Sequence, residues 1–350
     1  MPRSNEYYIM KNIYDLKLNE IEELISDMGE PLFRGKQIFG WLAKGVSSFD
    51  EMTNVPKQLI DRIAEEYEVL LPKVQQVQES FDGTKKFLFA LQDGNCIEAV
   101  FMKYKYGNSL CVSSQAGCRM GCSFCASTMD GLRRNLTSGE ILGQVLAAEN
   151  YTGEKVGHIV VMGTGEPFDN YENLKRFIEV INHKDGKNLG MRNITVSTCG
   201  LVPMIGVFAE DFDQVNLAIS LHSASDEVRT QMMPINKKYP ISVLLEACKK
   251  YVEKTNRRIT FEYTLVDGVN DSLDDALLLA GKLKGLNCHV NLIPLNEVKE
   301  TGLLTTPKER ALAFQKALEG KGIQCTIRRE LGDDIDGACG QLRLKSIAKE

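Results

Sequence analysis

The feature that most limits the possible folds is an alternation of short apolar runs with helix-like segments, which begins near Ser109. Six runs have the length of buried strands, and one of the helix-like segments opens at the capping box Thr137-Ser-Gly-Glu140. The alternation is typical of βαβ units and predicts an α/β fold with a parallel sheet. Because six units are too few for a closed eight-stranded barrel, we expect a partial, TIM-like (β/α)6 barrel, to which Ile323–Ile327 could add a strand. The six runs are Leu110–Ser113, Val156–Met162, Ile194–Ser197, Val215–Leu221, Ile259–Leu265 and Cys288–Ile293.

The chain before this alternation has a different pattern. Up to about Tyr67, apolar residues recur at helical spacing in Leu18–Met28, in Phe33–Leu42 and after Pro56. We therefore expect a small N-terminal helical domain over residues 1–67.

Strand and turn signals follow this helical region. Asp82-Gly83 and Asp93-Gly94-Asn95 are turn signals on either side of the strand-like run Lys86–Leu91. They predict a β-meander extension over residues 68–108, which leads into the barrel core over residues 109–350.

Composition and charge agree with an ordinary globular protein and exclude several other classes. With 43% hydrophobic and 25% charged residues, the chain resembles neither a disordered nor a fibrous protein. No apolar stretch approaches the ~20 residues of a membrane span, and the first residues lack the layout of a signal peptide. We therefore expect a cytoplasmic protein without a membrane partner. The net charge of −5 argues against a chain that coats nucleic acid by bulk electrostatics.

Positive charge is nevertheless concentrated locally. Between Ala99 and Leu136 five cations stand against one acidic residue, Asp130, and Arg328 and Arg329 form a second basic pair. A solvated surface is the commoner role of such residues, and a phosphate-facing patch is the alternative. The five cations are Lys103, Lys105, Arg119, Arg133 and Arg134.

The most informative stretch is Cys118-Arg-Met-Gly-Cys122-Ser-Phe-Cys125, which comes just after the first strand of the expected barrel. The carboxyl ends of barrel strands are where such folds hold their active sites. A structural zinc site would need a fourth ligand, whereas three cysteines on a cubane leave one iron open to a substrate. Both interpretations are possible from the spacing. The chain has ten cysteines, and we interpret Cys96, Cys199, Cys248, Cys288 and Cys325 as small buried apolar residues.

The cysteine spacing resembles the signature of the radical S-adenosylmethionine (SAM) superfamily. The resemblance implies a [4Fe-4S] cluster on Cys118, Cys122 and Cys125, whose open iron binds SAM and whose reduced form generates a 5′-deoxyadenosyl radical. The turn Met162-Gly-Thr-Gly-Glu-Pro167 resembles the superfamily's loop for the methionyl end of SAM, which implicates Gly165 and Glu166. The resemblance also implies five further SAM contacts, for which helix capping or turn formation is the alternative role. These are Ser197, Ser220, Leu221, His222 and Asn296, at or just beyond later strand ends.

Three further segments narrow the resemblance: Leu110-Cys-Val-Ser-Ser-Gln115, Met233-Pro-Ile-Asn236 and Gly332-Asp-Asp-Ile-Asp-Gly-Ala-Cys-Gly-Gln-Leu342. With the N-terminal helical region, they resemble the adenine-2 methyltransferases that act on large-subunit (23S) ribosomal RNA and transfer RNA. This resemblance covers nearly the whole chain.

The resemblance also implies catalytic roles for two cysteines and a carboxylate. Cys339 would receive a methyl group from one SAM molecule. The radical from a second SAM molecule would remove a hydrogen from this S-methyl group, and the resulting methylene carbon would add to adenine C2. Cys111 would then attack Cys339, releasing the product and forming a disulfide. Glu98 would accept the C2 proton. Without the resemblance, Cys111 would be interpreted as a buried cysteine and Glu98 as a surface charge at a strand edge.

The expected partners follow from the same resemblance. They are 23S rRNA and tRNA, in which the target base must be exposed or flipped, and an electron donor of the flavodoxin type. We expect a monomer. Two rival functions are a sister class that methylates adenine C8 and confers antibiotic resistance, and an RNA-binding module with a structural metal. Proline after Gly165-Glu166 favours C2 over C8.

Overall fold

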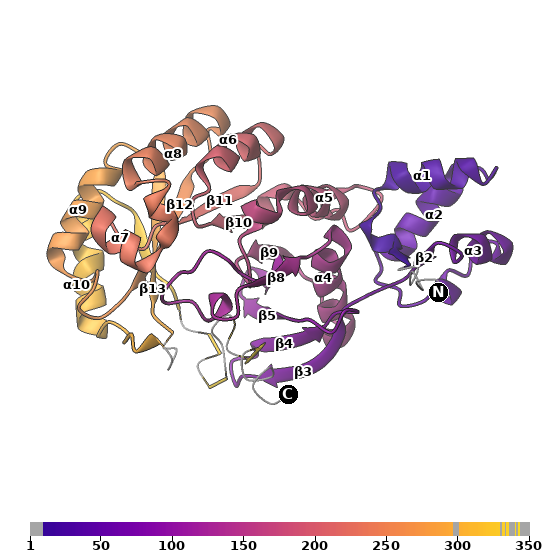
Figure 1. Ribbon diagram of the computed structural model, residues 1–350, viewed down its shortest axis with the longest axis horizontal. Helices are drawn as coiled ribbons and strands as arrows, with labels where there is room; N and C mark the ends of the chain where they lie inside the picture. The colour runs from indigo at the N-terminus through magenta and orange to yellow at the C-terminus, as the bar shows by residue number, and fades with distance from the viewer. Residues whose placement is uncertain are drawn as a thin grey trace, which may run out of the picture.

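The computed structural model describes residues 10–296, 301–329, 331–332, 334–335, 340 and 342–343. Its first part is a small helical unit at one end of an elongated molecule (Figure 1). Its first and last strands pair in parallel, which brings the two ends of the unit together. The elements are β1 (Lys11–Asn12), α1 (Leu18–Asp27), α2 (Phe33–Leu42), α3 (Lys57–Ile63) and β2 (Tyr67–Glu68).

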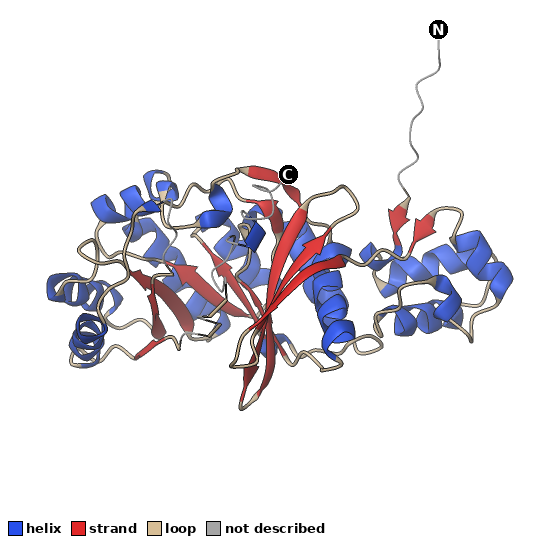
Figure 2. Cartoon of the chain, turned by 90° about the horizontal axis from the view of Figure 1, so that it is seen from below, coloured by secondary structure: helices blue, strands red, loops and turns tan. Residues whose placement is uncertain are grey.

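The rest of the described chain is built around one open ten-stranded sheet (Figure 2). Its strand order is β14-β13-β12-β11-β10-β9-β6-β5-β4-β3, and the seven strands from β14 to β6 are parallel. The α/β class and the partial barrel are therefore confirmed, and the further strand expected near the C-terminus is β14. The parallel strands are β6 (Gly107–Cys111), β9 (His158–Val161), β10 (Ile194–Thr198), β11 (Asn216–Ser220), β12 (Ile259–Leu265), β13 (Cys288–Pro294) and β14 (Cys325–Ile327).

Helices connect the parallel strands and cover the outside of the partial barrel (Figure 1). The Thr137–Glu140 capping box is confirmed, since each side chain accepts a hydrogen bond from the other residue's backbone N–H. Asp15 Oδ1 accepts the Gly139 N–H at 2.7 Å, which joins the helical unit to the first turn of α4. The helices are α4 (Ser138–Thr152), α5 (Tyr171–Asn182), α6 (Val202–Asp211), α7 (Asp226–Met232), α8 (Ile241–Thr255), α9 (Leu273–Leu283) and α10 (Lys308–Glu319). Short 3-10 turns are η1 (Ile13–Asp15), η2 (Phe49–Glu51), η3 (Ala126–Thr128), η4 (Pro167–Asn170), η5 (Met191–Asn193) and η6 (Pro234–Lys237).

The predicted meander is present as three antiparallel strands, β3 (Lys73–Glu79), β4 (Lys85–Ala90) and β5 (Cys96–Tyr104). It continues the barrel sheet, because β5 pairs with β6. The division of the chain into three domains stays a prediction.

The two faces of the meander differ in what covers them. One face carries phenylalanines such as Phe87 and Phe89 and packs into the main core, where Phe87 meets Tyr151 of α4 edge to face. The opposite face carries Lys86, Leu88 and Glu98, all with 3% exposure or less. Residues near the C-terminus lie on this second face, as the hydrogen bonds below show.

None of the described helices is long and apolar enough to cross a membrane.

Candidate functional site

The three clustered cysteines lie in a loop that is closed by a two-stranded hairpin, β7 (Gln115–Gly117) and β8 (Leu132–Asn135). Gly117 has a φ of +81°, and a Cβ there would lie 1.9 Å from the carbonyl oxygen of Gly131. Only glycine allows the two ends of the loop to come this close. Thr128 Oγ1 further fixes the loop by donating to the carbonyl oxygens of Cys122 and Cys125, at 3.3 and 3.0 Å.

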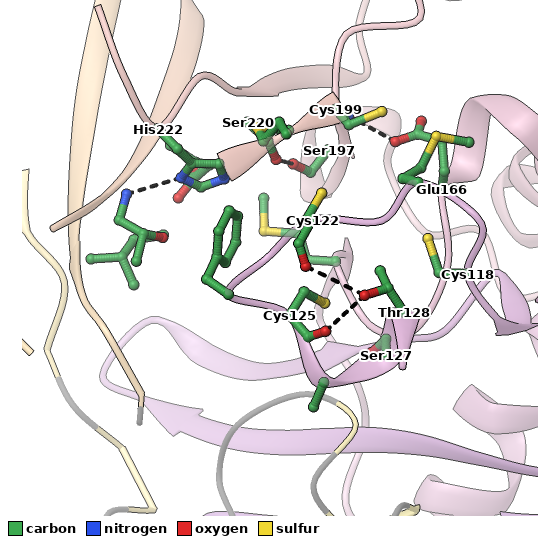
Figure 3. A pocket seen from close by; sticks show the side chains of 18 of the residues that line it. Cys118, Cys122, Cys125, Ser127, Thr128, Glu166, Ser197, Cys199, Ser220 and His222 are labelled. Carbon is green, nitrogen blue, oxygen red and sulfur yellow. Dashed lines mark hydrogen bonds between the residues drawn. The ribbon is translucent and has the colours of Figure 1, made fainter. Parts of the chain in front are cut away.

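This loop forms one wall of a pocket at the carboxyl ends of the parallel strands, which is where the sequence places the active site (Figure 3). Leu221 is buried and does not line the pocket; its backbone N–H instead donates to the carbonyl oxygen of Glu262. The pocket brings together nine of the residues that the sequence predicts for the site. They are Cys118, Cys122, Cys125, Gly165, Glu166, Ser197, Ser220, His222 and Asn296.

The glycine-rich turn after β9 presents backbone to this pocket. Gly165 has a φ of +110°, and a Cβ there would lie 2.6 Å from the Cβ of Gln115. The neighbouring Glu166 carboxylate accepts the N–H groups of Cys199, at 2.7 Å, and Phe168, at 3.0 Å. Burial raises the pKa of Glu166, while these N–H groups lower it. Glu166 therefore fixes the turn after β9 to the end of β10, and the backbone around Gly165 lies against the pocket without an intervening side chain.

His222 contributes a neutral imidazole to the same pocket. Its Nδ1 accepts the N–H of Thr264 at 2.9 Å, so the ring hydrogen is on Nε2 (Figure 3). Burial lowers its pKa to about 3, with a smaller contribution from Arg229, which keeps the ring uncharged near neutral pH. Phe124, within the cysteine motif, packs edge to face on this ring with centroids 4.8 Å apart. The arrangement makes His222 a hydrogen-bond donor that is fixed in orientation.

Sequence reasoning missed Arg229, a fully buried side chain of α7. Its guanidinium donates to the carbonyl oxygens of Cys199 (2.9 Å), Ser220 (3.2 Å) and Leu221 (3.1 Å), and to Asn236 Oδ1 (2.8 Å). It thereby holds together the ends of β10 and β11, where Ser197 and Ser220 enter the pocket. Asn236 was visible in the sequence as part of a motif, but nothing there indicated its partner.

Two further pocket residues, Glu262 and Arg328, were also not predicted as site residues. Glu262 projects from β12, and Asn291 Nδ2 donates to its Oε2 at 2.8 Å. Burial raises the pKa of Glu262, partly offset by the Asn291 hydrogen bond and the charge of Arg328. Arg328 directly follows β14, and many strand-end residues only cap or turn the chain. Glu262 lies in the middle of β12, where a carboxylate among apolar residues was the available signal.

The donor set of the cysteine loop fits an iron–sulfur cluster. Among the described residues, no three His, Cys, Asp or Glu side chains are arranged to hold one metal ion. A cubane instead takes its thiolates on three different irons, so the sulfurs need not converge on one point. Burial raises the pKa of Cys118 to about 12, and a bound metal would favour the thiolate. Three sulfurs that do not converge on one point fit a cubane better than a single zinc ion.

Cys111 and Glu98 lie outside the pocket lining, on the sheet face that also carries Lys86 and Leu88. Cys111 of β6 is paired in register with Val100 of β5, and Glu98 is two residues from Val100, so their side chains share one face. Both are buried. Cys339 lies outside the described residues, so its predicted disulfide with Cys111 stays a prediction.

The residue that follows Cys339 connects these two parts of the site. Gly340 donates its N–H to Glu98 Oε2 at 2.6 Å. It has a φ of +86°, and a Cβ there would lie 2.7 Å from the backbone nitrogen of Ser127. Ser127 belongs to η3, which directly follows Cys125 and lines the pocket. Gly340 is therefore held between Glu98 and the cysteine loop.

Four of the five cations of the basic cluster pair with carboxylates: Lys103 with Glu154, Arg119 with Asp169, Arg133 with Asp130, and Arg134 with Asp93 and Glu140. The role of the cluster as a phosphate-facing patch stays a prediction.

Of the cysteines interpreted as buried apolar residues, two differ. Cys96 is half-buried at the start of β5, and its thiol hydrogen-bonds to Gln75 Oε1 at 3.1 Å. Cys199 is buried but lines the pocket. The other three are buried, as predicted.

Comparisons with known proteins match almost the whole chain. Residues 112–280 match the family model described as the radical SAM superfamily. Residues 11–69 match the model described as the ribosomal RNA large subunit methyltransferase N-terminal domain.

Two curated relatives are described as "Probable dual-specificity RNA methyltransferase RlmN". The protein from Clostridium perfringens (strain SM101 / Type A) is 54% identical over 340 residues, which are 97% of this chain and 98% of that protein. The protein from Geobacillus thermodenitrificans (strain NG80-2) is 52% identical over 345 residues, covering 97% of this chain and 95% of that protein. A solved structure, a radical SAM methyltransferase from Sphaerobacter thermophilus, has a TM-score of 0.91 and 45% identity, covering 95% and 98% of the two chains.

Proposed function

This chain belongs to the RlmN-type family of radical SAM methyltransferases, and we propose that it methylates C2 of a specific adenosine in 23S rRNA and of an adenosine in tRNA, through S-methylated Cys339. The observation that carries the proposal is the position of Gly340. Its contacts to Glu98 and to Ser127 hold the residue after Cys339 between the cysteine loop and the face that carries Cys111.

The family's cofactors are a [4Fe-4S] cluster and SAM. When bound, they supply the radical that activates an S-methyl group, a route open to a carbon such as adenine C2 that polar methyl transfer cannot reach. Cys118, Cys122 and Cys125 would hold the cluster. The Gly165 backbone, the Ser197 and Ser220 hydroxyls, the His222 Nε2–H and Asn296 would bind and orient SAM.

The chain's own sulfur and oxygen atoms then account for the remaining steps. Cys339 has to be a thiol, because sulfur both accepts a methyl group and stabilises a radical on the adjacent carbon. Glu98 would take the C2 proton; among the described residues its Oε1 accepts only the Arg343 N–H, so this oxygen retains a lone pair. Cys111 would attack the sulfur of Cys339, forming a disulfide and releasing the methylated RNA.

Several parts of the proposal concern partners. The disulfide must be reduced in each cycle, and the cluster needs electrons, which a flavodoxin-type donor in the cytoplasm would supply. We propose that the protein acts as a monomer and that the N-terminal helical unit contacts the RNA, because the base must be exposed from a structured substrate.

The test is nucleoside analysis of RNA treated with the reconstituted protein. We expect 2-methyladenosine from unmodified 23S rRNA and tRNA, and none when SAM is omitted. Since 2- and 8-methyladenosine have equal mass, they are separated by chromatography against synthetic standards. Exclusive formation of 8-methyladenosine would assign the chain to the C8 class, and RNA binding without any methylated nucleoside would contradict both methyltransferase functions.

A further inference from the structure

The face of the meander that carries Glu98 contains a second buried charge, Lys86. Lys86 of β4 and Glu98 of β5 are diagonal neighbours on this face, with 3.2 Å between Lys86 Nζ and Glu98 Oε2. The side chains are 0% and 3% exposed, respectively. A carboxylate in such a place is costly unless a cation and hydrogen-bond donors compensate it. Lys86 provides that cation.

The hydrogen-bond donors are backbone N–H groups of the C-terminal segment, by which we mean the described residues between 332 and 343. Glu98 Oε2 accepts the N–H of Gly340 and Oε1 accepts the N–H of Arg343, both at 2.6 Å. Hydrogen bonds from backbone N–H to a charged carboxylate are stronger than neutral ones, and these two are shielded from water. The pair Lys86–Glu98 thus attaches the backbone at Gly340 and Arg343, which follow Cys339 in the sequence, to the sheet.

The other contacts of this segment are more exposed. Asp334 accepts the Ser80 hydroxyl and the Phe81 N–H, and Asp82 accepts the Gly332 N–H at 3.1 Å. Exposed contacts of this kind contribute little on their own. Arg343 also donates to Asp130 at 3.0 Å, next to the cysteine loop. Of these contacts, the bonds to Glu98 are the ones nearest Cys339 in the sequence.

We propose that Lys86 is a positioning residue: its ammonium supplies the counter-charge that keeps the Glu98 carboxylate bonded to the backbone on the C-terminal side of Cys339. Removing the ammonium leaves the carboxylate buried without its cation, so the site opens to water or Glu98 turns away. In either case the Cys339 segment loosens while the barrel remains folded. The relevance to catalysis rests on the proposed function, but the docking itself does not.

The experiment compares Lys86→Met with Lys85→Met in the full-length, cluster-containing protein. Lys85 is the matched control, because it is the adjacent lysine of β4 and its ammonium pairs with Glu79 instead, at 2.6 Å. Amide hydrogen exchange is followed by mass spectrometry on a peptide that spans residues 332–343 and on peptides from β10 and β12. We expect about 10- to 100-fold faster exchange of the 332–343 peptide in Lys86→Met alone, from the loss of charge-assisted hydrogen bonds.

A Glu98→Gln variant makes the test independent of whether Lys86→Met folds well. It keeps the shape of the side chain but removes the charge, and we expect the same selective loosening. With RNA as substrate, kcat of Lys86→Met should fall while KM for RNA changes little, because the Lys86 side chain is fully buried and does not contact the RNA. Unchanged exchange in both variants, or equal acceleration in the segment and in β10 and β12, would overturn the proposal. Selective loosening in a protein that makes no methylated nucleoside would instead support the docking and contradict the proposed function.

Discussion

Alanine at any one of Cys118, Cys122 or Cys125 is expected to abolish both the visible absorbance of the cluster and the cleavage of SAM. In the proposed site each cysteine would hold a different iron of a cubane that has only three protein ligands. Their loop is held at its ends by Gly117 and cannot bring a substitute side chain into place. We therefore expect iron content and 5′-deoxyadenosine formation to fall together to background.

The control for this prediction is Cys248→Ala. Cys248 is a fully buried cysteine of α8 that does not line the pocket, so its loss is expected to cost about 1 kcal/mol of stability with the cluster retained. Measurements are absorbance, iron analysis and product chromatography on anaerobically reconstituted protein. Continued 5′-deoxyadenosine formation in a variant of the cysteine loop would refute the assignment of the three ligands.

Cys111→Ala is expected to stall as a covalent protein–RNA adduct, whereas Cys339→Ala forms none. In the proposed reaction, addition to the adenine requires Cys339 and the cofactors, so removal of Cys111 should leave that step intact. Release requires a second sulfur to attack Cys339, and Cys111 lies on the same sheet face as Glu98, to which Gly340 is bonded. Most of the Cys111→Ala protein should therefore migrate with labelled RNA on a denaturing gel after one turnover.

Cys288→Ala provides the matched control for the adduct. Cys288 is a buried cysteine at the start of β13, away from the pocket, and its replacement should give free methylated RNA and no adduct. If Cys111 were only a core residue, its alanine variant would behave like this control, with lower stability and normal product. That outcome would mean that another thiol resolves the intermediate.

The sequence was sufficient where structure depends on local patterns. The Thr137–Glu140 capping box predicted the start of α4, because both hydrogen bonds are made within one turn. The apolar runs predicted the parallel strands, and strand ends then predicted which side chains meet in one pocket. Gly165 was predicted from the resemblance of its turn to the superfamily's loop for SAM, because a glycine-rich turn by itself is only a weak signal.

The sequence was insufficient where a side chain's role depends on distant partners. Arg229 bonds to carbonyl groups that any sequence possesses, so no residue type signals its role. Lys86 is an ordinary strand lysine until the fold places Glu98 and Gly340 beside it. The ion pairs of the basic cluster were not predictable for the same reason, because the carboxylates that pair with Arg119 and Lys103 are 50 and 51 residues away in the sequence. Charge counted along the chain does not show which ion pairs form.

The central claim is that the methyl group reaches RNA through Cys339, and a labelling measurement tests it most directly. The reconstituted protein, with Cys339 initially unmethylated, is given SAM with a fully deuterated methyl group, and RNA is added later. Mass spectrometry should find the intact label on the peptide that contains Cys339 before RNA is present. It should then find the label in adenosine with one deuterium lost, because a hydrogen is removed from the S-methyl group. Methylated adenosine at full yield from a protein whose Cys339 never carries the label would contradict the account.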